Sequence, residues 1–121
     1  MITRITIKSE PADRSYKDRL TITRSSVRYE NETYVPGVRT VPKKWTVSSD
    51  SPAFVKMFGN LCEEVQTLMQ MEEGNAATQT TFTIMNDNGE KEEKTLRQVD
   101  EVYTVCFTIV DQMVRCAGRK D

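Results

Sequence analysis

The chain has 121 residues, of which 37% are hydrophobic and 29% are charged, and its formal net charge is −1. This length corresponds to one domain, residues 1–121, and the patterned apolar residues exclude an intrinsically disordered protein. The sequence contains no histidine, which removes the side chain most often used for proton transfer near neutral pH and the commonest metal ligand.

The beginning of the chain predicts β-strands, because apolar and polar residues alternate there. The alternation runs through residues 2–7 and again through residues 20–24. Residues 9–18, which lie between these runs, are polar and predict a loop. The alternation changes phase at Ser25-Ser26, as expected for a tight hairpin.

A turn and a further strand are expected before the first helix. Pro36-Gly37 indicates a type II turn, since proline fixes its own φ and glycine supplies a positive φ. Residues 44–48 then form a strand, with Trp45 and Val47 on one face. The first half of the chain is therefore expected to contribute four strands.

Ser51-Pro52 predicts a helix start, because serine caps free backbone N–H groups and proline suits the first helical position. Apolar residues then recur three or four positions apart, as in an amphipathic helix: Phe54, Phe58, Leu61, Val65 and Leu68. We expect the helix to extend from Pro52 to about residue 72 and to end before Gly74-Asn75.

A second hairpin is expected after this helix. Residues 81–84 alternate, and the turn sequence Asn86-Asp87-Asn88-Gly89 follows them. Asn-Gly is the strongest short sequence signal for a hairpin turn. The return strand, residues 90–94, is almost wholly charged, which is typical of an edge strand that resists aberrant pairing.

The C-terminal segment predicts a second helix. Thr95 and Gln98 have the spacing of a capping box. Apolar residues follow at helical spacing: Val99, Tyr103, Cys106, Val110, Met113 and Ala117. Gly118 ends the element. The β-branched and aromatic content alone favours a strand, but the caps and the length favour a helix.

The element order is therefore β-β-β-β-α-β-β-α, which predicts an α+β fold. We expect an antiparallel sheet of about five or six strands with both helices packed on one face.

The sequence offers no arrangement of residues for catalysis, and we expect a protein that is not an enzyme. Its acidic residues occur as adjacent pairs, such as Glu63-Glu64, which diverge on a helix or a strand. The turn at 86–90 lacks the ligand spacing of an EF-hand. No metal ligands, catalytic residues or cofactors are therefore expected, and the three cysteines, which form no CxxC pair, are expected to be reduced and mostly buried.

The charge distribution favours macromolecular binding instead. Residues 1–50 carry ten Lys/Arg and six Asp/Glu, whereas residues 51–121 carry seven and twelve. Tyrosine, tryptophan and arginine are enriched at interface hot spots. The candidate partner-binding residues are Tyr29, Tyr34, Arg39, Lys43, Lys44 and Trp45. We expect a protein–protein interaction module, an accessory or inhibitor protein that self-associates. The alternative is single-stranded nucleic-acid binding, because basic and aromatic residues interleave over residues 14–45.

No apolar run approaches the roughly 20 residues of a membrane span. The first ten residues lack the apolar region of a signal peptide. A cytoplasmic protein without membrane contacts is therefore expected.

Three sequence stretches carry a resemblance: LTITRSSVRYE, KKWTVSSDSPAF leading into an amphipathic helix, and FTI followed by a turn and a charged strand. The pattern resembles small uncharacterised α+β proteins of Gram-positive gut bacteria and their mobile elements. The resemblance implies the same element order and a bacterial, phage-related setting, and it carries over no activity. The shape would also suit a phage-encoded inhibitor of a host defence system, such as an anti-CRISPR protein.

Overall fold

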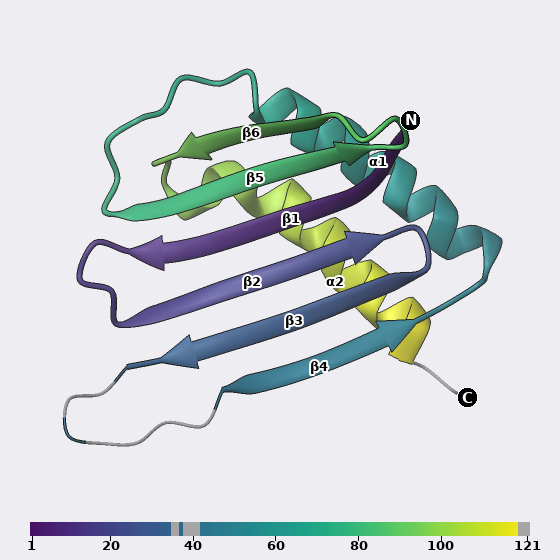
Figure 1. Cartoon of the computed structure of the whole chain (residues 1–121), viewed down its shortest axis with the longest axis horizontal. Coiled ribbons are helices and arrows are strands. Elements are labelled where there is room, and N and C mark those ends of the chain that lie inside the picture. The colour runs from purple at the N-terminus through teal and green to yellow at the C-terminus, as the bar shows by residue number, and fades with distance from the viewer. Residues whose placement is uncertain (35–36, 38–41, 119–121) are drawn as a thin grey trace.

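The computed structural model describes residues 1–34, 37 and 42–118, and this part of the chain forms six strands and two α-helices (Figure 1). The strands are β1 (Ile2–Pro11), β2 (Tyr16–Thr23), β3 (Ser26–Thr33), β4 (Lys43–Ser48), β5 (Thr78–Asn86) and β6 (Lys91–Leu96). The helices are α1 (Pro52–Leu68) and α2 (Thr104–Gly118), and a short 3₁₀ helix, η1 (Asp100–Tyr103), precedes α2. Neither α-helix has the length and apolar character needed to cross a lipid bilayer.

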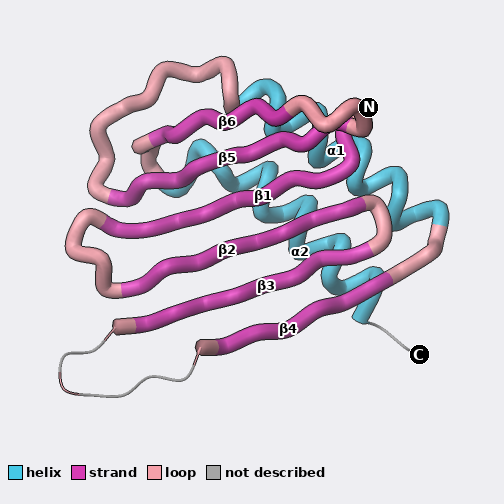
Figure 2. The backbone as a smooth tube through the Cα atoms, in the orientation of Figure 1, coloured by secondary structure: helices cyan, strands magenta, loops and turns pink. Residues whose placement is uncertain are grey.

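The strands form one antiparallel sheet in the order β4-β3-β2-β1-β5-β6. Both helices lie on the same face of this sheet, and no helix of the described residues lies over the opposite face, which we call the open face (Figure 2). The α+β class, the element order and the edge position of β6 are therefore confirmed.

The strand register explains which face is buried. One row of paired residues crosses the sheet beneath the helices: Ile84, Ile5, Ile22, Val27 and Val47. All of them except the half-buried Val47 are fully buried. The helices cover this row with the apolar stripe of α1 and with Tyr103, Cys106, Val110 and Met113.

Helix α1 begins where the sequence predicts. The Ser51 side-chain oxygen accepts the backbone N–H of Phe54 at 3.2 Å, a cap that is typically worth about 1 kcal/mol. All five stripe residues are buried. The helix ends at Leu68 rather than near residue 72, because Gln70 and Met71 donate to carbonyls three residues earlier and form a tighter turn.

The first predicted loop is shorter than expected. The structure extends β1 to Pro11 and begins β2 at Tyr16, so that residues 9–11 and 16–18 are paired in strands. Pairing of β1 with β5 and of β2 with β3 extends the two strands beyond their apolar alternation. The next hairpin is confirmed with its turn at Arg24-Ser25, because Thr23 pairs with Ser26. The type II turn expected at Pro36-Gly37 involves Pro36, which lies outside the described residues.

The predicted capping box of Thr95 and Gln98 is wrong. Strand β6 continues through Leu96, and the Thr95 hydroxyl forms a hydrogen bond with that of Thr81 at 3.0 Å. The Gln98 amide donates to the Glu72 carbonyl oxygen at 2.7 Å instead of capping a helix. Helical structure begins only at Asp100, and Val99 is 57% exposed rather than part of the buried stripe.

Candidate protein-interaction surface

The helices leave one end of the sheet uncovered. In Figure 1, α2 lies behind the start of β3 and the end of β4, and no helix lies behind the opposite ends of these strands. Tyr29 and Trp45 face each other near the middle of β3 and β4. Their rings stack with centroids 5.4 Å apart, and Trp45 remains 40% exposed. The pair therefore presents an exposed indole ring that stacks on the ring of Tyr29.

Polar contacts fix the tyrosine of this pair. The Tyr29 hydroxyl donates to Asp18 Oδ1 at 2.8 Å, and the Asn31 amide donates to the same oxygen. We call Asp18, Tyr29, Asn31 and Trp45 the aromatic ledge. Burial, together with the hydrogen bond to the Asp18 carboxylate, raises the pKa of Tyr29 to about 12. Tyr29 is therefore neutral at physiological pH.

This environment predicts a late tyrosine titration. The pKa of Tyr29 lies above its ordinary value of 10.0 in the folded chain, so stability that depends on the neutral hydroxyl is complete below pH 10 and is lost as the pH rises toward 12. Phenolate absorbance should therefore include a late phase that Tyr29→Phe removes and Asp18→Asn moves to lower pH. The hydrogen bond to Glu32 also raises the pKa of Tyr34, so Tyr34→Phe serves as the comparison. A phase near pH 12 that Tyr29→Phe leaves unchanged would contradict the assignment.

The structure separates the six predicted contact residues. Lys43 lies on the same side of β4 as Trp45, whereas Lys44 lies on the open face opposite Glu30. Tyr34 follows β3, is 52% exposed and donates its hydroxyl to Glu32. Arg39 lies outside the described residues. Tyr29, Lys43 and Trp45 therefore share one side of the sheet.

Sequence reasoning missed Asp18 and Asn31. The two residues face each other across the hairpin of β2 and β3. Counting outward from a turn at Arg24-Ser25 pairs Asp18 with Asn31. This pairing was not predicted, because residues 9–18 were expected to form a loop rather than part of a strand.

Strand β4 is an edge strand, and no strand of the described part of the chain pairs with its outer side. The Ser49 N–H donates to the Ser25 carbonyl oxygen at 2.9 Å, and antiparallel pairing alternates residue by residue. Trp45 and Val47 therefore direct their backbone groups toward β3, while Lys44, Thr46 and Ser48 direct theirs outward. These three residues can accept another strand.

The other edge of the sheet is protected differently. Strand β6 begins with the charged run Lys-Glu-Glu-Lys, and charges of this kind discourage edge-to-edge pairing. Strand β4 carries charge only at Lys43 and Lys44. Of the two edges, β4 is the better suited to strand addition.

The acidic side chains and the thiols are the remaining groups to consider. No group of three or more Cys, Asp or Glu side chains gathers as a metal site within the described ranges. Burial raises the pKa of Cys106 to about 12 and that of Cys62 to about 11. Both thiols are therefore protonated at neutral pH and are weak nucleophiles.

Comparisons of the chain with protein-family models, with curated proteins and with solved structures found no match. The resemblance to small proteins of gut bacteria therefore stays a prediction.

Proposed function

We propose that the chain is a non-enzymatic module that binds another protein by adding a partner strand to β4. The observation that carries this proposal is the exposed Trp45 on an edge strand, stacked on Tyr29. Main-chain hydrogen bonds would supply affinity in such a complex, and side chains beside the edge would supply specificity.

The residue types of the ledge support this proposal. Tryptophan and tyrosine dominate interface hot spots, because they bury a large area at a small cost in conformational entropy. Tyr29 is already ordered by stacking on Trp45 and by its hydrogen bond to Asp18. Its side chain therefore loses little conformational entropy when a partner binds. This pre-organisation favours affinity.

The aromatic ledge is poorly suited to binding single-stranded nucleic acid, which requires rings that stack on the bases and cations beside them that bind the backbone. Alternation along the strands separates the rings from neighbouring cations: Tyr29 and Trp45 lie on the helix side with Lys43, whereas Arg28 and Lys44 lie on the open face. The Asp18 carboxylate, rather than Arg28 or Lys44, lies beside the Tyr29 ring. Its negative charge would repel the phosphates of a nucleic acid bound to the ledge.

Self-association can use this edge as well. Antiparallel pairing of two β4 strands centred on Thr46 would set Lys44 opposite Ser48 of the second copy, without like charges facing each other. The equivalent pairing of two β6 strands, centred on Glu93, would set Glu93 opposite Glu93 of the second copy, which is unfavourable. Light scattering of the purified chain would measure whether it dimerises, and loss of the dimer in Thr46→Pro would assign the contact to β4.

Two single variants, Thr46→Pro and Trp45→Ala, test the proposal. The Thr46 N–H points away from β3, so proline there removes only an outward donor, and edge strands tolerate this. We expect Thr46→Pro to weaken partner binding by about tenfold and Trp45→Ala by about 30-fold. Partners cross-linked to β4 in the source cells would be identified first, and their affinities would then be measured by calorimetry.

Glu93→Pro is the matched control, because it removes an outward donor from the middle of the opposite edge. We expect it to leave the affinity unchanged. Equal loss in Glu93→Pro, or full affinity in both β4 variants, would refute strand addition at β4.

A further inference from the structure

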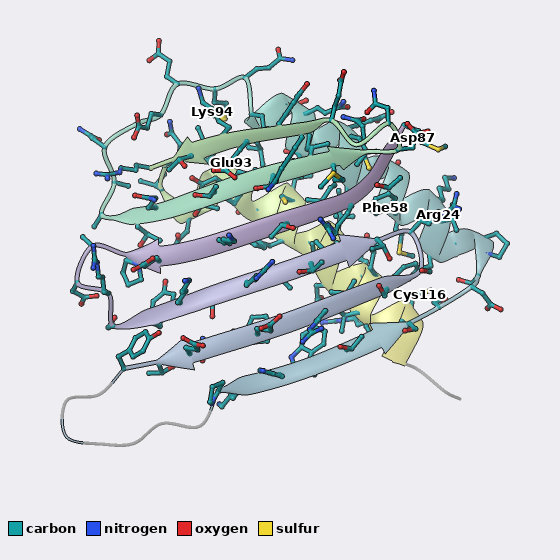
Figure 3. All side chains as sticks on the ribbon, viewed as in Figure 1. Arg24, Phe58, Asp87, Glu93, Lys94 and Cys116 are labelled. Atoms are coloured by element: carbon teal, nitrogen blue, oxygen red, sulfur yellow. The ribbon has the colours of Figure 1, made fainter. Side chains whose placement is uncertain are left out.

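The open face differs chemically from the helix side. Its side chains are the residues that alternate with the buried row, and Figure 3 views the sheet from this side, with Glu93 labelled on β6. Among the described strand residues, it carries no aromatic ring and many threonines. Its cations are Arg4, Lys8, Lys17, Arg19, Arg28, Lys44 and Lys91, and its carboxylates are Glu10, Glu30, Glu32 and Glu93.

Four of these cations surround a small hollow. Arg4 and Lys8 of β1, Arg19 of β2 and Lys91 of β6 line it. The nearly buried Thr6 and Thr83 lie between them, and the hollow has a volume of about 70 Å³. Its one carboxylate, that of Glu93, accepts a hydrogen bond from Thr83 at 3.3 Å. We call Arg4, Lys8, Arg19 and Lys91 the basic cluster.

Glu93 is the one carboxylate among the residues that line the hollow, against the four cations of the basic cluster. In the part of the chain that the structure describes, none of its four cations forms an ion pair. Lys8 lies directly opposite Arg19, an unfavourable like-charge pair.

Besides Glu93, two other carboxylates near Lys8 and Arg19 are already bound by other arginines. Glu30, which pairs with Arg19 from the other side, is bound by Arg28 at 3.2 Å, and Glu10 lies 3.8 Å from Arg14. A bound anion would supply the missing charge between Lys8 and Arg19.

We propose that the basic cluster binds the phosphodiester backbone of a nucleic acid without reading its bases. Lysine, arginine and threonine are typical contacts of phosphate oxygens. Arg4 and Lys8 are four residues apart on one strand, so the cluster extends about 13 Å and spans more than one phosphate. The absence of rings among the described residues of this face leaves the bases without a stacking partner.

The charge of the helices, on the opposite side of the molecule, also favours binding of a polyanion at the open face. The two α-helices and η1 carry five carboxylates and two cations. The resulting separation of charge steers a polyanion toward the open face. This surface is distinct from the edge of β4, so its test is independent of the proposed protein interaction.

Salt dependence of binding tests the proposal. Fluorescence anisotropy would follow a labelled single strand of about 20 nucleotides, its duplex, and a polyglutamate peptide of similar length. With four phosphate contacts, a rise from 50 to 200 mM salt should weaken single-strand binding about 50-fold and duplex binding about 150-fold. Lys8→Gln combined with Arg19→Gln should reduce these factors to about 7-fold and about 12-fold.

Lys56→Gln combined with Arg115→Gln is the matched control, because it removes the same charge from α1 and α2. It should keep the original salt dependence. Binding of neither nucleic acid at 50 mM salt, equal loss in this control, or tighter binding of polyglutamate than of either nucleic acid would overturn the proposal.

Discussion

Replacing Phe54 with alanine should lower the free energy of unfolding by about 3–5 kcal/mol. Phe54 is fully buried in the first turn of α1, where its side chain belongs to the core between the helices and the sheet. Truncation removes apolar area from the core and leaves a cavity. Since a domain of this size is stable by only about 5–15 kcal/mol, urea denaturation should reveal a large shift of the midpoint.

Val55→Ala provides the comparison within the same helical turn. Val55 is 45% exposed, so its truncation should change the stability by no more than about 0.5 kcal/mol. If the two variants lost equal stability, Phe54 would not lie in the core, and the packing of α1 against the sheet would be wrong.

The elements that the sequence predicted best are those defined within a few residues. The Ser51 cap and the spacing of Phe54, Phe58 and Leu61 specify the start and the buried face of α1 without reference to the rest of the chain. The Asn86–Gly89 turn is equally local, and Gly89 has the positive φ of +85° that the turn requires. Cap and turn chemistry act at short range, so one sequence suffices to find them.

The errors arose where distant partners decide the structure. Thr95 and Gln98 could form a capping box in isolation, but Thr95 pairs with Thr81 in the sheet and Gln98 bonds to Glu72. These contacts join residues 14 and 26 positions apart. Sheet pairing of this kind outweighs a local preference that is typically worth about 1 kcal/mol.

The candidate site was predicted only in part for the same reason. Residue type alone indicated Tyr29 and Trp45, and their stacking follows from the pairing of β3 with β4. The contribution of Asp18 depends on the register of β2 with β3, which the expected loop obscured. The basic cluster depends on three strand pairings, so no short stretch of sequence indicates it.

Gly74→Ala should destabilise the fold by about 2–4 kcal/mol, combining left-handed strain with steric overlap. Gly74 has a φ of +80° and forms a parallel bridge with Arg97, just after β6. An added Cβ would overlap the Arg97 carbonyl oxygen and lie 2.8 Å from Gln98 Nε2. The same Arg97 oxygen accepts the Ala76 N–H at 2.8 Å, so the overlap disrupts the join between the segment after α1 and the segment after β6.

Gly89→Ala isolates the two contributions. Gly89 has a similar φ of +85°, but a Cβ there would have no atom within 4 Å. Alanine at position 89 should therefore cost only the backbone strain, about 1–2 kcal/mol. The difference between the two variants in urea denaturation measures the steric overlap at Arg97. Equal losses would mean that Gly74 is not packed against Arg97 and that the two segments are not joined there.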